Sequence, residues 1–470
     1  MKNTLPLRFR EIDQDHMFVA DDAGRFFKAD NEFVGRYATS KLNQRDLTYL
    51  KNRGMVFNDQ MDISYSSFIS TWAKRQYSPS RKAYLILVPT LRCDLNCTYC
   101  QVSRAPIGAK GFDWTEEKAD QAIDYILSLD VDEVQIEFQG GEPFLRLDLI
   151  QKIFKKIRQH ISKSSFVVCT NLQNLSPEII EFAKNRDVFI STSLDGPTNH
   201  HSRNRTKSEK LTNEFQNNLK KLISTIGIEK VSALPTIDLN TPPTPHELID
   251  EFDKYGIHSI YLRPVNYQGF ARKQHPKSIG VDDWLDYYNK FIKEIISRNF
   301  RSKKIISEFY LVHILKRILG PGHDGHTDLR NPNVPTALNV VIDFDGKIYP
   351  SDEARMLARI RKIDLSIGAL GAGVDSNKIN AIAPAFINNF DAECIHCPYQ
   401  VYCGSDPVDD LSRSGRIDIP KRDTWFCRRH LAIFDLAIKL IYSNDPKVEF
   451  SILNWLNIKE LPHELRPSLS

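Results

Sequence analysis

From Tyr84 onward the chain alternates between short apolar runs and amphipathic segments, and this alternation constrains its fold more than any other feature. Helical patterns such as Thr115–Leu129 and Leu147–Ile161 separate the apolar runs. Alternation of this kind predicts a parallel sheet, with the chemistry at the carboxyl ends of its strands. The strand-like runs are Tyr84–Val88, Val134–Phe138, Phe166–Cys169, Val188–Ser193, Val231–Ile237 and Ser259–Leu262.

Three cysteines follow the first of these runs. Cys93, Cys97 and Cys100 stand in the spacing C-x3-C-x2-C, and no nearby fourth cysteine closes the site. Three thiolates this close can hold three corners of a cubane iron–sulfur cluster, which leaves one iron open to a ligand. A zinc ion is the alternative, although zinc sites more often use cysteines in two pairs.

The trio, with Tyr99 just before its third member, resembles the signature of the radical S-adenosylmethionine (AdoMet) enzymes. The resemblance implies a [4Fe–4S] cluster that AdoMet chelates through its open iron. It also implies that a 5′-deoxyadenosyl radical removes a hydrogen atom from an inert C–H bond. The expected fold is α/β, a partial (β/α)6 TIM-like barrel to which the six strand-like runs correspond.

Later strand ends resemble the family's AdoMet-binding motifs. Gln139 to Pro143 resembles its GGEP motif, in which two glycines permit close approach and Glu142 accepts hydrogen bonds from the amino group. The stretch from Ser193 to Arg205 reads S-x-D-G-P-x3-H-x3-R, as in peptide-modifying members. The fork of Arg205 suits a carboxylate. The resemblance thus implies AdoMet contacts by Tyr99, Gln139, Gly140, Gly141, Glu142, Asn171, Ser193 and Arg205.

Other residues near these strand ends carry simpler interpretations. Cys169 reads as a buried core thiol and His201 as a structural histidine. Arg263 matches an arginine of the family, but an ordinary ion pair would look the same.

A second group of cysteines lies near the C-terminus. Four thiolates make a closed site for a cluster or for a structural zinc ion. In this context the segment resembles the SPASM domain, the auxiliary-cluster module of peptide-modifying radical AdoMet enzymes. Pro407 and Ser351 stand where that family places cysteines of an inner cluster, so we expect one auxiliary [4Fe–4S] cluster instead of two. Its ligands would be Cys394, Cys397, Cys403 and Cys427.

Asp352 follows Ser351 and is the candidate catalytic residue. In sulfatase-maturing relatives an aspartate at this position accepts the substrate's proton. The alternative is a surface carboxylate near Glu353 and Arg355.

As a set, the motifs resemble the SPASM-type maturase of the His-Xaa-Ser peptide system. The matching stretches are Pro89–Cys93, Tyr99–Arg104, Glu137–Pro143 and Tyr349–Arg355. This implies a ribosomal precursor peptide with His-Xaa-Ser repeats as substrate, crosslinked at an unactivated carbon, and a reducing partner such as flavodoxin or ferredoxin. The alternatives are a formylglycine-forming sulfatase-maturing enzyme and a non-enzymatic iron–sulfur or zinc scaffold that binds peptides.

Length and composition are those of a multidomain protein. The chain has 470 residues, 41% of them hydrophobic. Its net charge of +4 is too small to argue for nucleic acid or a membrane surface. We expect a cytoplasmic protein, because no signal peptide or transmembrane run is evident and eight cysteines without an export signal indicate metal ligation.

We expect four regions. Residues 1–75 would form a small N-terminal α+β domain, 80–320 the barrel, 321–430 the SPASM-like domain and 431–470 a helical tail. The first region resembles winged-helix peptide-recognition elements, and a cap on the barrel is the alternative. Finer expectations are strands within Phe9–Ala20 and Arg25–Phe33, helices at Asn43–Arg53, Asp282–Leu319 and Ala432–Tyr442, a loop at Pro321–Pro335 and a hairpin at Leu338–Tyr349.

Overall fold

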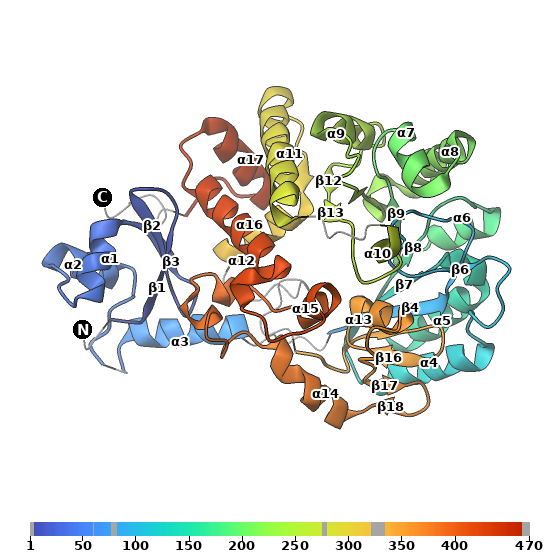
Figure 1. Ribbon diagram of the computed structural model, residues 1–470, viewed down its shortest axis with the longest axis horizontal. Coiled ribbons are helices and arrows are strands. Elements are labelled where there is room, and N and C mark those ends of the chain that lie inside the picture. The colour runs from blue at the N-terminus through green and yellow to red at the C-terminus, as the bar shows by residue number, and fades with distance from the viewer. Residues whose placement is uncertain (1–3, 60, 77–81, 275–279, 321–333, 463–470) are drawn as a thin grey trace.

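The computed structural model describes residues 4–59, 61–76, 82–274, 280–320 and 334–462. A small N-terminal sheet lies at one end of the molecule and a large sheet at the other (Figure 1). Helices α12, α15 and α16 lie between the two (Figure 1). Among the described residues, no helix is long and apolar enough to cross a membrane.

The N-terminal region is an antiparallel three-stranded sheet followed by three helices. The sheet consists of β1 (Leu7–Glu11), β2 (His16–Asp21) and β3 (Phe26–Asp30), and the helices are α1 (Asn31–Ala38), α2 (Gln44–Asn52) and α3 (Ile63–Gln76). Asn43 and Asp46 form a capping box on α2, as the expected helix requires. The expected third strand is too long, because Asp30 caps α1 and turns the chain into a helix before Phe33.

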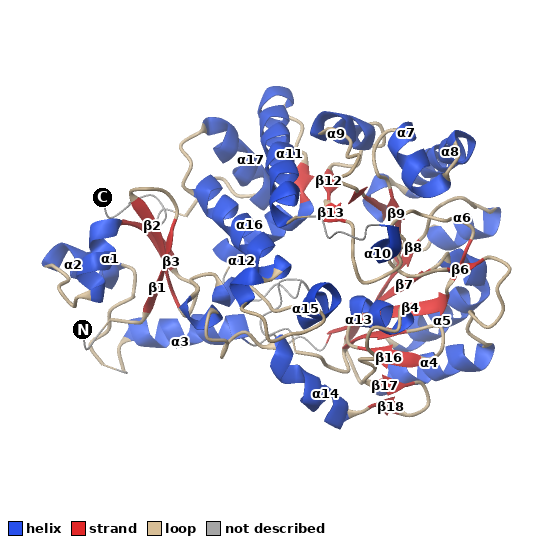
Figure 2. Ribbon diagram, in the orientation of Figure 1, coloured by secondary structure: helices blue, strands red, loops and turns tan. Residues whose placement is uncertain are grey.

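The large sheet contains five parallel strands in the order β10-β9-β8-β7-β4 (Figure 2). Its strands are β4 (Lys82–Thr90), β7 (Glu133–Gly140), β8 (Lys163–Cys169), β9 (Val188–Ser193) and β10 (Val231–Leu234). The connecting helices bury one apolar face each, as Ile153 and Ile157 do on α5. They are α4 (Glu116–Ser128), α5 (Leu147–His160), α6 (Pro177–Ala183), α7 (Thr198–His201), α8 (Glu209–Ile226) and α9 (Pro245–Asp253).

The expected fifth and sixth strands differ from the structure. Pro235 ends β10, since proline has no N–H for the ladder, and β11 (Thr236–Ile237) pairs with β13 (Arg263–Pro264) instead. The sixth run shortens to β12 (Ser259–Ile260), which pairs with β14 (Ser307–Glu308) outside the large sheet. The barrel therefore ends in two small ladders.

The other edge of the large sheet is extended by the expected hairpin. Strand β15 (Asn339–Ile342) runs parallel to β4 and antiparallel to β16 (Lys347–Tyr349), and Gly346 in the turn has a φ of 91°. Strands β17 (Gly368–Ala369) and β18 (Gly373–Val374) complete a sheet of nine strands. The result is a large mixed sheet with a parallel centre.

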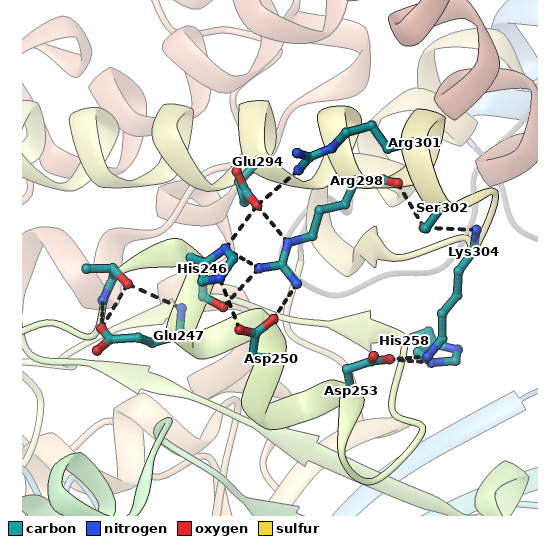
Figure 3. Close-up of polar contacts among 11 residues, drawn as sticks. His246, Glu247, Asp250, Asp253, His258, Glu294, Arg298, Arg301, Ser302 and Lys304 are labelled. Atoms are coloured by element: carbon teal, nitrogen blue, oxygen red, sulfur yellow. Dashed lines mark hydrogen bonds and ion pairs between the residues drawn. The ribbon is translucent and has the colours of Figure 1, made fainter.

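The expected helical stretch over Asp282–Leu319 consists of two helices, α11 (Val281–Ser302) and α12 (Phe309–Leu319). The chain breaks at Lys303, which has a left-handed φ of 58°. An ion pair joins α11 to α9: Arg298 contacts Asp250 of α9 at 2.5 Å, and within α11 it contacts Glu294 at 2.7 Å (Figure 3). These charged side chains therefore pair with one another between the two neighbouring helices.

The C-terminal third is helical. Its helices are α13 (Asp352–Arg359), α14 (Ser376–Ile382), α15 (Pro407–Ser414), α16 (Trp425–Ile441) and α17 (Pro446–Leu456). The expected tail helix begins earlier than Ala432, because Thr424 caps α16 and places Cys427 in its first turn. Helix α17 lies within residues 431–470, the expected helical tail. The loop expected at 321–335 falls mostly outside the described residues.

Candidate active site

A cavity of about 920 Å³ lies at the carboxyl ends of the parallel strands. Cys93, Cys97 and Cys100 line it, and so do Asp352 and Glu353 from the start of α13. Most residues to which the sequence assigns AdoMet contacts line the same cavity, namely Tyr99, Gln139, Gly140, Gly141, Asn171, Ser193 and Arg205. Cys93 and Glu353, which are 260 positions apart in the chain, thus line the same cavity.

The loop that carries the three cysteines is held at its base and from two sides. Strand β5 (Arg92–Cys93) pairs with β6 (Ala105–Pro106) and closes the base. Asn171 Nδ2 approaches Cys93 Sγ at 3.7 Å, and the Thr98 amide donates to the carbonyl of Asn204 at 2.9 Å. These contacts fix the loop over the ends of the strands.

The donor set fits an iron–sulfur cluster with one open iron. All three thiols are free and reach the same cavity. Burial raises the pKa of the Cys97 thiol to about 11, against the lowering effect of Arg205, and raises the pKa of Cys93 above its usual range. Such thiols keep their protons until a metal replaces them.

Gly140 and Gly141 bring β7 against the strand that leads to the cysteines. A Cβ on Gly140 would lie 2.1 Å from the Thr90 carbonyl oxygen, and one on Gly141 would lie 2.1 Å from that of Arg92. The Gly141 amide donates to Thr90 O at 3.0 Å. The two glycines are therefore required by the packing of the backbone itself, in addition to any ligand.

Glu142 joins the ends of β7 and β8. It accepts from the Phe144 amide (3.1 Å), the Thr170 hydroxyl (2.9 Å) and the Asn171 amide (2.8 Å). Burial raises the pKa of Glu142 to about 7 against these hydrogen bonds. The carboxylate expected to meet the amino group of AdoMet thus already holds the two strand ends together.

Arg205 and Tyr99 share a buried partner, Asp195, to which the sequence analysis assigned no role. The guanidinium of Arg205 donates to Asp195 at 2.7 and 3.1 Å, and the hydroxyl of Tyr99 donates to the same carboxylate. Arg205 also lies 5.3 Å from the centre of the Tyr99 ring. The Arg205 cation holds the pKa of Asp195 below its usual value despite burial. The fork expected to bind AdoMet is therefore engaged by Asp195, which orients both residues.

A second carboxylate that the sequence analysis missed, Glu137, lies inside the barrel. It accepts hydrogen bonds from Tyr84 (2.7 Å), Gln139 (2.6 Å) and the thiol of Cys169 (3.0 Å). All four residues line the large cavity. Cys169 thus lines the cavity. Glu137, its neighbour on the adjacent strand β7, is the residue of the sequence that could have indicated this. The alternation of β7 turns Glu137 and Gln139 to the same face.

Asp352 is held by a fully buried cation. Arg355 contacts it at 2.7 Å and also lies 3.6 Å from Asp343. Burial raises the pKa of Asp343 to about 6, and Arg355 opposes this. Asp352 is itself only 8% exposed, so the interpretation as an ordinary surface carboxylate does not fit.

The remaining residues behave more simply. His201 is buried and stacks on Phe215 with ring centres 4.5 Å apart, and burial lowers its pKa to about 4. Arg263 lies on β13 and lines the large cavity, 5.7 Å from the ring of Tyr261.

The four C-terminal cysteines surround a smaller cavity of about 220 Å³. The amide of Cys394 is held by Asp391 at 3.1 Å and that of Cys427 by Thr424 at 3.0 Å. Burial raises the pKa of Cys427 to about 12. No three His, Cys, Asp or Glu side chains in the described ranges stand close enough to hold a single metal ion. Four half-buried soft donors around one cavity fit a group wider than an ion.

Comparison with known proteins agrees with this geometry. Residues 87–233 match the model of the Radical SAM superfamily. A cysteine-type anaerobic sulfatase-maturating enzyme of Clostridium novyi is 24% identical over 65% of this chain and 81% of its own length. An uncharacterized protein of Methanocaldococcus jannaschii is 36% identical over 24% of this chain. The radical SAM cyclopropyl synthase TigE of Paramaledivibacter caminithermalis is 22% identical over 49% of this chain. The chain spans only 38% and 52% of the lengths of these last two proteins.

Solved structures share the fold. The enzyme anSMEcpe with bound AdoMet and Kp18Cys peptide superposes with a TM-score of 0.62 at 17% identity, over 80% of this chain and 99% of that one. Streptococcus suis SuiB bound to precursor peptide SuiA gives 0.51 at 14% identity, over 90% and 99%. The large sheet therefore matches the partial barrel of these structures. The region that carries the three-cysteine loop at the strand ends matches the Radical SAM superfamily, which implies AdoMet and a [4Fe–4S] cluster as cofactors.

Proposed function

We propose that this enzyme modifies a ribosomally made precursor peptide at an unactivated carbon and forms a crosslink. The observation that carries the proposal is the cavity of about 920 Å³, which brings the cysteine loop and Asp352 together. The relatives support a peptide: one is a sulfatase-maturating enzyme, and two of the similar structures contain a bound peptide. That the peptide carries His-Xaa-Ser repeats is a finer proposal, supported by the sequence motifs alone.

When bound, AdoMet and its cluster supply a 5′-deoxyadenosyl radical, which takes a hydrogen atom from the substrate. We assign Cys93, Cys97 and Cys100 to the cluster. Around AdoMet we place Gly140 and Gly141, whose close packing aligns the loop, and the Asp195-held pair Tyr99 and Arg205. Glu142, Gln139, Asn171 and Ser193 complete the proposed contacts at the ends of β7, β8 and β9.

After hydrogen abstraction, closing a new bond requires loss of one electron and one proton from the substrate radical. An oxidised auxiliary cluster on the C-terminal cysteines would take the electron, and the cavity offers two carboxylates for the proton. Asp352 is held in place by Arg355 at 2.7 Å. Glu137 lies on β7 and accepts hydrogen bonds from Tyr84, Gln139 and Cys169. We propose Asp352 as the acceptor, because it stands at the junction of the barrel with the C-terminal region.

We further propose one auxiliary cluster on Cys394, Cys397, Cys403 and Cys427. The positions of the two missing cysteines support a single cluster. The hydroxyl of Ser351 caps α13 by accepting from the Ala354 amide at 3.2 Å, and Pro407 begins α15. Val408 packs with Tyr349 and Leu357 in an apolar cluster. These packing contacts of the serine and proline positions support a single auxiliary cluster.

The test uses anaerobically reconstituted enzyme, reduced flavodoxin and a synthetic candidate peptide. We expect peptide-dependent formation of 5′-deoxyadenosine and a peptide product that has lost two hydrogens. A scaffold protein would form no 5′-deoxyadenosine under these conditions, and that result would overturn the proposal. Formylglycine, detected as a hydrazide-reactive aldehyde, would instead select the sulfatase-maturing alternative, which the Clostridium novyi relative favours.

Asp352→Asn separates hydrogen abstraction from the later proton transfer. An amide of the same shape cannot take the proton, so the variant should still form 5′-deoxyadenosine with peptide but much less product, by roughly 100-fold. Glu137→Gln is the matched comparison. If Asp352→Asn gives normal product and Glu137→Gln does not, the acceptor is Glu137.

A further inference from the structure

The smaller cavity has a wall from the opposite end of the chain. Besides the four cysteines it is lined by Phe9 and Arg10 of β1. The side chain of Arg8, on the same strand, donates to the Gln400 side chain at 3.1 Å and to the Cys397 carbonyl at 3.4 Å. The first strand of the protein thus lies against the segment that holds the auxiliary cysteines.

Arg10 is fixed there by a bidentate ion pair with Asp435 of α16. Its Nε and Nη2 both lie 2.6 Å from the two carboxylate oxygens. The hydroxyl of Tyr399, two residues after Cys397, donates to the same carboxylate at 2.9 Å. Arg10 and Asp435 are 35% and 24% exposed, so neither charge is fully screened by water.

The two charges have opposite signs and lie next to the cysteine cavity. Arg10 lines the same cavity as the four cysteines, and Asp435 is held to Arg10 at 2.6 Å. The pair is therefore nearly neutral as a unit, but either member by itself would leave a full charge near the cavity.

Other contacts keep the N-terminal sheet in this position. Phe18 of β2 packs on Tyr399 with ring centres 5.1 Å apart. Tyr402 donates to the Gly24 carbonyl at 2.5 Å. Buried Arg75 donates to the carbonyls of Ala23 and Arg317 at 2.7 and 3.1 Å. These contacts hold the N-terminal sheet against the segment that carries the C-terminal cysteines.

We propose that the N-terminal sheet forms one wall of the auxiliary-cluster site and that the Arg10–Asp435 pair sets the charge next to that cluster. The inference rests on the proposed auxiliary cluster. Net charge near the cluster and burial of the cluster are two of the factors that set the reduction potential of an iron–sulfur centre. Loss of the cation should stabilise the oxidised cluster, and loss of the anion should stabilise the reduced one.

The experiment is a redox titration of the auxiliary cluster by electron paramagnetic resonance. The full-length variant with Cys93, Cys97 and Cys100 replaced by Ala removes the AdoMet cluster and isolates the signal. In that background Arg10→Gln should shift the midpoint potential to more negative values and Asp435→Asn to more positive values. The double variant should lie near the parent, because both charges are gone.

Arg36→Gln is the matched control, since Arg36 makes a similar two-contact ion pair with Asp46 at 2.8 and 2.9 Å in the same N-terminal region. It does not line the cavity, so its variant should titrate like the parent. Arg10→Lys keeps the charge and should stay closer to the parent than Arg10→Gln. If Arg10→Gln does not retain iron, the midpoint potentials of Asp435→Asn and Arg10→Lys decide the question.

The results separate two failures. A parent triple variant without iron and labile sulfide refutes the proposed auxiliary cluster. A parent with a normal cluster, in which both single variants shift in the same direction or neither shifts, overturns the role of the Arg10–Asp435 pair. A merely structural role for the pair predicts loss of cluster without the opposite signs.

Discussion

Replacing Gly141 by Ala should impair the AdoMet site through the backbone alone. Gly141 has no positive φ, so alanine there is not strained by its own conformation. Its Cβ, however, would lie 2.1 Å from the Arg92 carbonyl oxygen and 2.5 Å from that of Leu91. Neither is the end of a flexible side chain that can swing aside.

The required movement follows from the contact distance. An ordinary contact begins at 3.4 Å, and 3.4 Å minus 2.1 Å leaves a shortfall of about 1.3 Å. Arg92 immediately precedes Cys93, so the strand must carry the first cysteine with it or separate from the loop that contains Glu142. A misplacement of about 1 Å at a reacting site can cost roughly 100-fold in rate.

The assay is 5′-deoxyadenosine formation per iron-loaded enzyme under anaerobic reduction. We expect Gly141→Ala to fall by about 100-fold while the protein remains folded by circular dichroism and keeps its auxiliary-cluster iron. Gly108→Ala is the control, because a Cβ there meets nothing within 4 Å and the backbone needs no positive φ. A Gly141→Ala enzyme with normal turnover and normal iron content would refute the reasoning.

Three further predictions follow from the same geometry. The reconstituted chain should bind roughly eight irons, and the Ala variant of Cys93, Cys97 and Cys100 roughly four; twelve in the wild type would contradict a single auxiliary cluster. Arg205→Lys keeps the charge but loses the two contacts to Asp195, so equilibrium dialysis should show weaker AdoMet binding at unchanged iron content. An unchanged affinity would remove Arg205 from the site. In the folded state burial raises the pKa of Glu142 from 4.5 to about 7. The protonated side chain therefore contributes fully to the free energy of unfolding below about pH 4.5, and this contribution is lost as the pH rises through 7. Urea unfolding of the apoprotein should therefore favour Glu142→Gln over the wild type by about 3 kcal/mol more at pH 8 than at pH 5, and a pH-independent difference would show that Glu142 is not shifted.

Local patterns in the sequence predicted the elements and the cluster loop. The alternation after Tyr84 predicted the parallel strands, and the helices expected from Asn43 and from Thr115 do begin there, each capped by that residue. The cysteine spacing indicated the candidate cluster site, because three ligands within eight residues need no distant partner. Strand alternation, helix starts and cysteine spacing depend on residues that are close in the chain, so the sequence pattern indicates them directly.

The tertiary structure alone decided which distant groups meet. It gave Arg205 and Tyr99 a common partner in Asp195, turned Cys169 toward Glu137, and paired the sixth strand-like run with β14 instead of with the main sheet. It also placed Arg10 beside Asp435, 425 positions away, so that β1 lies against the segment that carries the C-terminal cysteines. The pattern of the sequence does not predict such pairs. A charge removed from water is stable only beside a partner, and that partner is brought to it by folding from a distant part of the chain.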